Sequence, residues 1–139
     1  MIAKINRFHG HGSLRYLYKN GQTHRSRLFN LKVIKNTRRK NSRFVVVVSK
    51  KVSKKAVVRN RIRRRIYEYI QNQTENLNDI YDIAIIVTSV DVAEMDFLEL
   101  TSQLQHLLVE AKTIPNNLKG WYTIYQTFSR EQPWIYLNY

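Results

Sequence analysis

Three segments of the chain have the hydrophobic patterns of β-strands. Residues 27–35 alternate between two kinds of position, which predicts a strand whose two faces meet different surroundings. One side of this segment is apolar (Phe29, Leu31, Val33), and the other is mixed (Leu28, Asn30, Lys32, Ile34). Residues 43–49 (RFVVVVS) and 80–88 (IYDIAIIVT) are largely continuous apolar runs, which predict strands buried on both faces.

Three other segments have helical periodicity. Residues 13–20 form a short candidate helix that Ser13 can cap and Gly21 can end. Residues 56–73 and 94–111 predict two long amphipathic helices. The first long helix has its apolar stripe at Val58, Ile62, Ile66, Tyr69 and Ile70. The second is expected to turn inward Phe97, Leu100, Leu104, Leu107 and Leu108.

The order of these elements is α-β-β-α-β-α, and it predicts an α/β (α+β) two-layer sandwich. A buried strand, a long helix and a second buried strand form a βαβ unit, whose two strands we expect to be parallel. We place this domain at residues 1–112. Residues 113–139 hold seven of the 16 aromatic residues and form a C-terminal extension. Packing on the domain surface is favoured over base stacking for these aromatics.

Composition narrows the class of protein. The 139 residues include no cysteine, which excludes a disulfide scaffold, a thiolate zinc site and a cysteine nucleophile. The apolar runs are far shorter than the ~20 residues of a membrane span. No apolar signal core follows Met1. We expect a single-domain cytoplasmic protein with no membrane partner and no obligate protein partner.

Charge is distributed very unevenly. The formal net charge is +14, but no acidic residue precedes Glu68, so residues 1–67 carry +21 and the rest of the chain carries −7. A solvated basic face would not require so large an imbalance, and the default partner is a polyanion, most simply nucleic acid. A membrane surface fits less well, because no basic helix carries a large apolar face with Trp or Phe.

The basic residues are densest between Lys50 and Arg65, where nine of sixteen positions are Lys or Arg. Several of them fall at the start of the helix predicted for residues 56–73, where the helix dipole disfavours cations by ~0.3–1 kcal/mol each. A bound phosphate would compensate for that cost, because backbone N–H groups, dipole and guanidinium groups all favour an anion there. The pattern therefore predicts a phosphate-binding helix end.

The same segment resembles the signature of the bacterial ribonuclease P protein subunit. FVVVVSKKV (residues 44–52), followed by AVVRNRIRR (residues 56–64), is similar to the family's V-S-K-K strand end and its R-N-R helix. Weaker likenesses run from about residue 5 to residue 112. Ser53 stands where many members have Gly, and Leu14 and Lys32 stand where aromatic residues are frequent. Residues 113–139 have no counterpart in the family pattern.

The resemblance implies an RNA-based endonuclease. The holoenzyme removes the 5′ leader of precursor tRNA, and a catalytic RNA with Mg²⁺ held mainly by that RNA performs the hydrolysis. The protein would be an accessory subunit without catalytic residues or a tightly bound cofactor, with a left-handed βαβ crossover. The residues implied in binding the catalytic RNA are Lys50, Lys51, Lys54, Lys55, Arg59, Asn60, Arg61, Arg63, Arg64 and Arg65.

The resemblance also implies a cleft for the single-stranded leader, between the first helix and the mixed face of the first predicted strand. The candidate residues are Arg7, Phe8, Leu14, Tyr18, Leu28, Asn30 and Lys32. Tyr18 can stack a base, and Lys32 supplies charge where an aromatic ring is frequent. The alternative for Tyr18 is burial beside Leu17.

Other functions fit the residues less well. A structural RNA-binding protein, such as a ribosomal protein, is the main alternative, and a DNA regulator is a weaker one. A metal site at His9 and His11 lacks nearby carboxylates. The scattered residues Asp79, Asp82, Asp91 and Asp96 are better explained by local capping than by a two-metal nuclease site. The sequence offers no set of side chains for protein-based catalysis.

Overall fold

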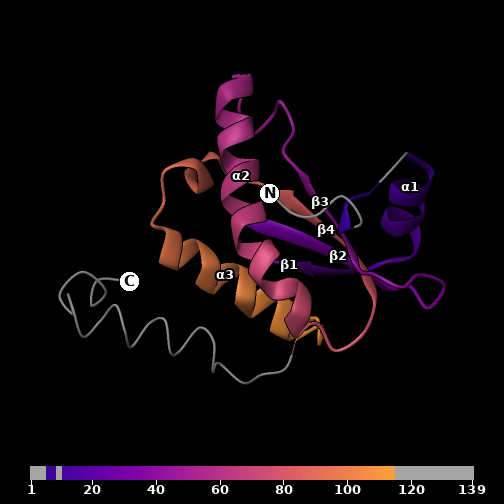
Figure 1. The fold of residues 1–139 in the computed structure, drawn as a ribbon. Helices are drawn as coiled ribbons and strands as arrows, with labels where there is room; N and C mark the ends of the chain where they lie inside the picture. The colour runs from indigo at the N-terminus through magenta and orange to yellow at the C-terminus, as the bar shows by residue number, and fades with distance from the viewer. Residues whose placement is uncertain (1–5, 9–10, 115–139) are drawn as a thin grey trace, which may run out of the picture.

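The computed structural model describes residues 6–8 and 11–114 of the chain. Three helices and a four-stranded sheet make up this part (Figure 1). The elements, with two short 3₁₀ turns, are α1 (His11–Asn20), β1 (Gln22–Arg25), β2 (Phe29–Lys35), β3 (Arg43–Val47), α2 (Ala56–Gln73), η2 (Thr74–Asn76), β4 (Tyr81–Val87), η3 (Val90–Ala93) and α3 (Phe97–Glu110). The predicted α/β sandwich is confirmed.

The sheet has the strand order β1-β2-β4-β3. β3 and β4 are parallel, as the βαβ pattern predicts, and β2 pairs antiparallel with both β1 and β4. The strand β1 (QTHR) was missing from the predicted order, because its four polar residues show no apolar alternation. The handedness of the β3-α2-β4 crossover stays a prediction.

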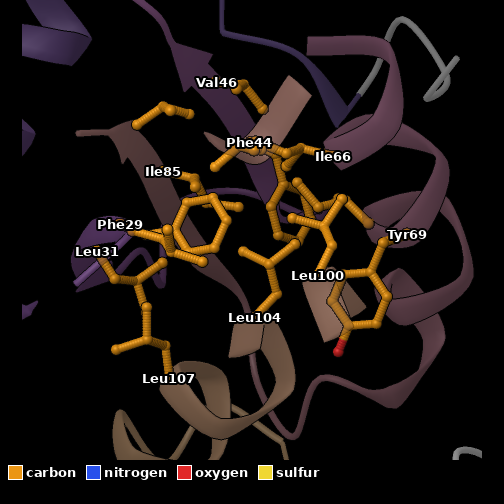
Figure 2. Close-up of a cluster of buried hydrophobic side chains, with 14 of the residues drawn as sticks. Phe29, Leu31, Phe44, Val46, Ile66, Tyr69, Ile85, Leu100, Leu104 and Leu107 are labelled. Atoms are coloured by element: carbon orange, nitrogen blue, oxygen red, sulfur yellow. The ribbon is translucent and has the colours of Figure 1, made fainter. Parts of the chain in front are cut away.

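One face of the sheet is closed by α2 and α3, which lie together against it in Figure 1. The apolar side of β2 meets residues of β3, β4 and both helices there in one buried cluster (Figure 2). Phe29, Phe44, Ile66, Ile85 and Leu104 are each almost inaccessible to solvent in this cluster. Burying one such side chain contributes roughly 1.5–3 kcal/mol, so this closed face provides most of the stability of the fold.

Among the described helices, α1 covers the other face of the sheet. Leu17 of α1 is fully buried and lies outside the main cluster, and the Lys32 ammonium donates a hydrogen bond to the Tyr18 carbonyl at 3.2 Å. α1 ends at Gly21, whose N–H donates to the Leu17 carbonyl. A Cβ atom at Gly21 would come within 2.6 Å of that carbonyl oxygen, so only glycine fits this position.

Three details of the predicted packing are wrong. Leu28 is fully buried in the main cluster, because it precedes β2 and does not follow that strand's alternation. Phe97 is 36% exposed, because α3 begins only at this residue, after the N-cap Asp96. Val45 and Val47 are half-buried, because α1 does not cover the β3 end of the open face.

The start of the C-terminal segment belongs to the fold. Thr113 and Ile114 are buried, and Ile114 joins the main cluster, two residues beyond the predicted domain boundary. The rest of the predicted extension, residues 115–139, lies outside the described residues.

Candidate nucleic-acid interface

The N-terminal end of α2 presents a dense group of cations. Lys50, Lys51, Lys54 and Lys55 precede the helix or cap it, and all four are exposed. Lys55 is the N-cap and makes no capping hydrogen bond through its side chain, and the first turn holds no acidic residue. The free N–H groups of this turn and the dipole of the helix therefore add to the positive charge of the lysines.

Three arginines of α2 bind the protein's own backbone. The Arg59 guanidinium donates to the Ser53 carbonyl at 2.9 Å. Arg65 donates to the Val92 carbonyl at 2.7 Å and also to the Met95 carbonyl. Arg63 donates to the Asn60 side-chain oxygen at 2.9 Å and, more weakly, to the Val48 carbonyl at 3.4 Å. These side chains fix the loop before α2 and the η3 segment, so they position the surface as well as charging it.

Arg61 and Arg64 differ from those three. Arg61 forms an exposed ion pair with Glu94 at 3.4 Å, a partner 33 positions away that helix periodicity does not reveal. Arg64 is exposed, and among the described residues nothing forms a hydrogen bond or ion pair with its side chain. Arg64 and the four lysines are thus the cations of this surface with donors free for a phosphate.

The predicted leader-binding residues lie in three places: most on the open face, two beside β3, and one on the closed face. Leu14 and Tyr18 of α1 lie over the open face, to which Asn30 and Lys32 of β2 belong. Tyr18 is 36% exposed, whereas Leu17 is fully buried, so Tyr18 is not the core residue of this helix. Partial burial raises the pKa of the Tyr18 hydroxyl above its ordinary value. Leu28 is buried on the closed side and offers no surface to a ligand.

Arg7 and Phe8 lie at the start of β3. Arg7 forms an isolated parallel bridge with Phe44, and the Phe8 ring centre lies 4.5 Å from the Arg43 guanidinium carbon. Both residues are half-buried beside the edge strand. Phe8 already stacks on an arginine and is therefore engaged within the fold.

A buried ion pair organises this end of the open face. The Arg43 Nη2 and Nε donate to the two Asp82 carboxylate oxygens at 2.7 Å and 2.9 Å, and both side chains are about 95% buried. Asn36 donates to the same carboxylate at 2.8 Å. Sequence reasoning missed this pair, because the parallel register that places Arg43 opposite Asp82 becomes known only from the sheet.

Asp79 and Asp96 each have a local structural role. Asp79 pairs with Lys35 at 2.7 Å, and this hydrogen-bonded contact lowers the pKa of the Asp79 carboxyl and raises that of Lys35. Asp96 caps α3 by accepting a hydrogen bond from the Leu98 N–H, as predicted.

The described residues contain no group of three His, Cys, Asp or Glu that could hold a metal ion. The described residues therefore do not offer the grouped oxygen ligands that a bound Mg²⁺ needs. His9 and the side chain of His11 lie outside the described residues.

Comparison with known proteins identifies the family. The family model for ribonuclease P matches residues 2–112. The chain belongs to the ribonuclease P protein family. It is 31% identical over 117 residues to the ribonuclease P protein component of Pseudanabaena, covering 84% of this chain and 100% of the relative. It is 33% identical over 118 residues to that of Staphylococcus epidermidis, covering 85% of this chain and 100% of the relative.

Solved structures of ribonuclease P proteins have the same fold. The Staphylococcus aureus protein is similar with a TM-score of 0.71 and 27% identity, over 79% of this chain and 98% of that one. The Thermotoga maritima protein, 24% identical over 70% of this chain and 89% of that one, shares the fold with a TM-score of 0.63. Within residues 6–8 and 11–114 of this ribonuclease P family member, no helix has the length and apolar character needed to cross a membrane.

Proposed function

We propose that this chain is the accessory protein subunit of a cytoplasmic ribonuclease P, and that it binds both the catalytic RNA and the 5′ leader of precursor tRNA. The RNA, with its Mg²⁺, performs the endonucleolytic cleavage that gives the mature 5′ end. The observation that carries the proposal is the uncapped, acid-free end of α2 with its free cations, in a chain of this family.

The two RNA contacts use different surfaces. Lys50, Lys51, Lys54, Lys55 and Arg64 bind phosphates of the catalytic RNA, because their donors are exposed and unused by the fold. Asn60 is also exposed, although its side-chain oxygen accepts from Arg63. The leader binds the open face between α1 and the mixed side of β2, where half-buried apolar side chains and Lys32 meet the stacking and charge requirements of single-stranded RNA.

Reconstitution tests the function directly. The purified chain is added to ribonuclease P RNA, and precursor-tRNA cleavage is measured at several Mg²⁺ concentrations. We expect the largest stimulation at low Mg²⁺, where the protein's positive charge replaces counterions, and no cleavage by the chain alone. Cleavage by rigorously RNA-free protein, or a failure to stimulate the RNA at any Mg²⁺ concentration, would contradict the proposal.

Substitutions at two adjacent arginines test RNA binding and folding separately. Arg64→Ala should lower the slope of log affinity for the catalytic RNA against log salt by about 0.7–0.9, because one phosphate contact is lost. Its melting temperature should stay near that of the wild type. Arg65→Ala removes the contacts with the carbonyl of Val92 in η3 and the carbonyl of Met95 after it, and should cost about 1–3 kcal/mol in the free energy of unfolding. An unchanged salt slope for Arg64→Ala would show that this arginine is only solvated.

A further inference from the structure

A pocket opens at the end of the sheet opposite to the basic end of α2. Its walls are the first turns of α1, the end of β2 with the following turn, and the starts of β3 and β4. The charged side chains that line it are Lys35, Arg38, Arg39, Arg43 and Asp82, and Tyr16 stands at its α1 wall. β3 separates the two surfaces by about 15 Å, because the pocket includes its first residue and the lysines before α2 follow its end.

The charge of this pocket is not neutralised by the fold. Arg43 is paired with Asp82, and Lys35 is paired with Asp79. Arg38 and Arg39 are exposed, and no carboxylate of the described residues lies within 4.0 Å of either guanidinium group. Two permanent positive charges therefore remain at the mouth of the pocket, with forked donors suited to a phosphate.

Hydrogen bonds to Ile80 and Asp82 fix the start of the turn that carries these arginines. The Asn36 N–H donates to the Ile80 carbonyl at 2.9 Å, and its side-chain amide donates to Asp82. The Asn36 side-chain oxygen accepts from the Arg38 N–H at 3.3 Å. Because the buried Arg43–Asp82 pair anchors Asn36, the start of the turn is preorganised, and a ligand would not have to order it.

An aromatic ring stands beside the cations. Tyr16 is 60% exposed, the highest exposure among the large aromatic side chains of the described residues. Gly12, one turn earlier in α1, has nothing within 4 Å of where a Cβ atom would be, so this wall leaves open space. A cationic mouth beside an exposed ring matches the requirements of a single-stranded nucleotide, whose phosphate needs positive charge and whose base needs a stacking surface.

We propose that this pocket binds a phosphate of the single-stranded 5′ leader, with a neighbouring base stacked on Tyr16. The inference rests on the proposed function. The leader is favoured over the catalytic RNA because the pocket continues the open face: Lys32 and Ile34 share the mixed side of β2, and Asn36 lies about 13 Å beyond Lys32 along the chain. The pocket extends the leader's path beyond Tyr18.

The test uses the holoenzyme assembled from this chain and ribonuclease P RNA. Affinity is measured for precursor tRNA with a long leader and with a leader cut short, for Arg38→Ala, Arg39→Ala and the control Lys40→Ala. Lys40 is exposed and follows directly in the chain, but it does not line the pocket. For the long leader, each arginine variant should lower the log–log salt slope by about 0.7, and Lys40→Ala should not. For the short leader, all three should match the wild type.

Tyr16 provides a second readout. Tyr16→Ala should weaken long-leader binding by roughly 5- to 150-fold, and Tyr16→Phe should restore it, because stacking needs only the ring. Equal losses with both leaders, or an effect of Lys40→Ala as large as those of its neighbours, would overturn the pocket assignment. Wild-type affinity in all variants would overturn it as well. In each of these cases the wild-type chain would still stimulate cleavage by ribonuclease P RNA. A failure of the proposed function would instead abolish that stimulation.

Discussion

The two faces of the sheet are built from the same strands but differ in what covers them. The closed face packs against α2 and α3, and every side chain of its central cluster is almost inaccessible. The open face is covered by α1 alone among the described helices, and it mixes half-buried valines with Asn30, Lys32 and one buried ion pair. The closed face therefore supplies stability, and the open face gives up part of that burial to leave a surface on which another chain can lie.

The largest expected effect concerns the buried ion pair of the open face. Arg43→Met leaves the Asp82 carboxylate buried without its charge partner, and should cost about 3–5 kcal/mol in the free energy of unfolding. Chemical denaturation measures this loss. The double variant Arg43→Met with Asp82→Leu should recover most of it, because no buried charge is left unpaired. A single-variant loss below about 1 kcal/mol would show that water reaches the carboxylate.

On the closed face, Leu104→Ala should cost about 2–5 kcal/mol, because Leu104 is fully buried between the helices and the sheet. At a temperature where the variant stays folded, its affinity for precursor tRNA should equal that of the wild type. Thermal melting and substrate binding measured on the same preparation check both statements. Selective loss of leader affinity in the folded variant would mean that the two faces are coupled.

The open face should show the opposite behaviour at Tyr18. Tyr18→Ala should cost about 1–3 kcal/mol of affinity for precursor tRNA, if its ring stacks a leader base. The affinity for mature tRNA, which has no leader, and the melting temperature should hardly change, because Tyr18 is 36% exposed. Equal losses for both RNAs together with a lower melting temperature would instead make Tyr18 a structural residue.

The smallest expected effect is a gain in the free energy of unfolding. The Tyr69 hydroxyl is buried in the closed face and has no hydrogen-bond partner among the described residues, so Tyr69→Phe should stabilise the fold by about 1 kcal/mol. Burial raises the pKa of Tyr69 above its ordinary value of 10.0, so the folded state keeps a proton that the unfolded state loses. Stability should therefore fall above about pH 10 more steeply in the wild type than in Tyr69→Phe. Parallel pH dependences would contradict this.

The closed face could be predicted from sequence because periodicity reports burial. The alternation in β2 and the stripe of α2 give Phe29, Leu31, Ile62 and Ile66 their correct places. The same reasoning failed where an element begins, at Leu28 and Phe97, because periodicity constrains a side chain only within a regular element. It also failed for β1, whose residues are polar and mostly exposed at a sheet edge.

The basic surface at the start of α2 could be predicted from sequence in its composition but not in its contacts. The charge run locates the basic end of α2, since a helix wheel shows which positions avoid the core. It does not show that Arg59 and Arg65 donate to backbone carbonyls or that Arg61 meets Glu94. The Arg59 contact depends on the loop before α2, and the other two depend on where η3 and the residue after it lie. The pocket at the other end of the sheet likewise depends on segments that are distant in sequence, brought together by the Arg43–Asp82 register.

The protection of the edge strand β3 has a consequence for self-association. An apolar β-branched strand at a sheet edge is a template on which other copies can add strands and aggregate. Here the Val46 N–H donates to the Tyr67 hydroxyl at 3.1 Å, the Val48 carbonyl accepts from Arg63, and Arg7 bridges to Phe44. These contacts occupy several of the backbone groups that a second copy would need to pair with this edge. The helix that carries the cations proposed to bind RNA thereby also helps to keep this apolar edge strand from pairing with another molecule.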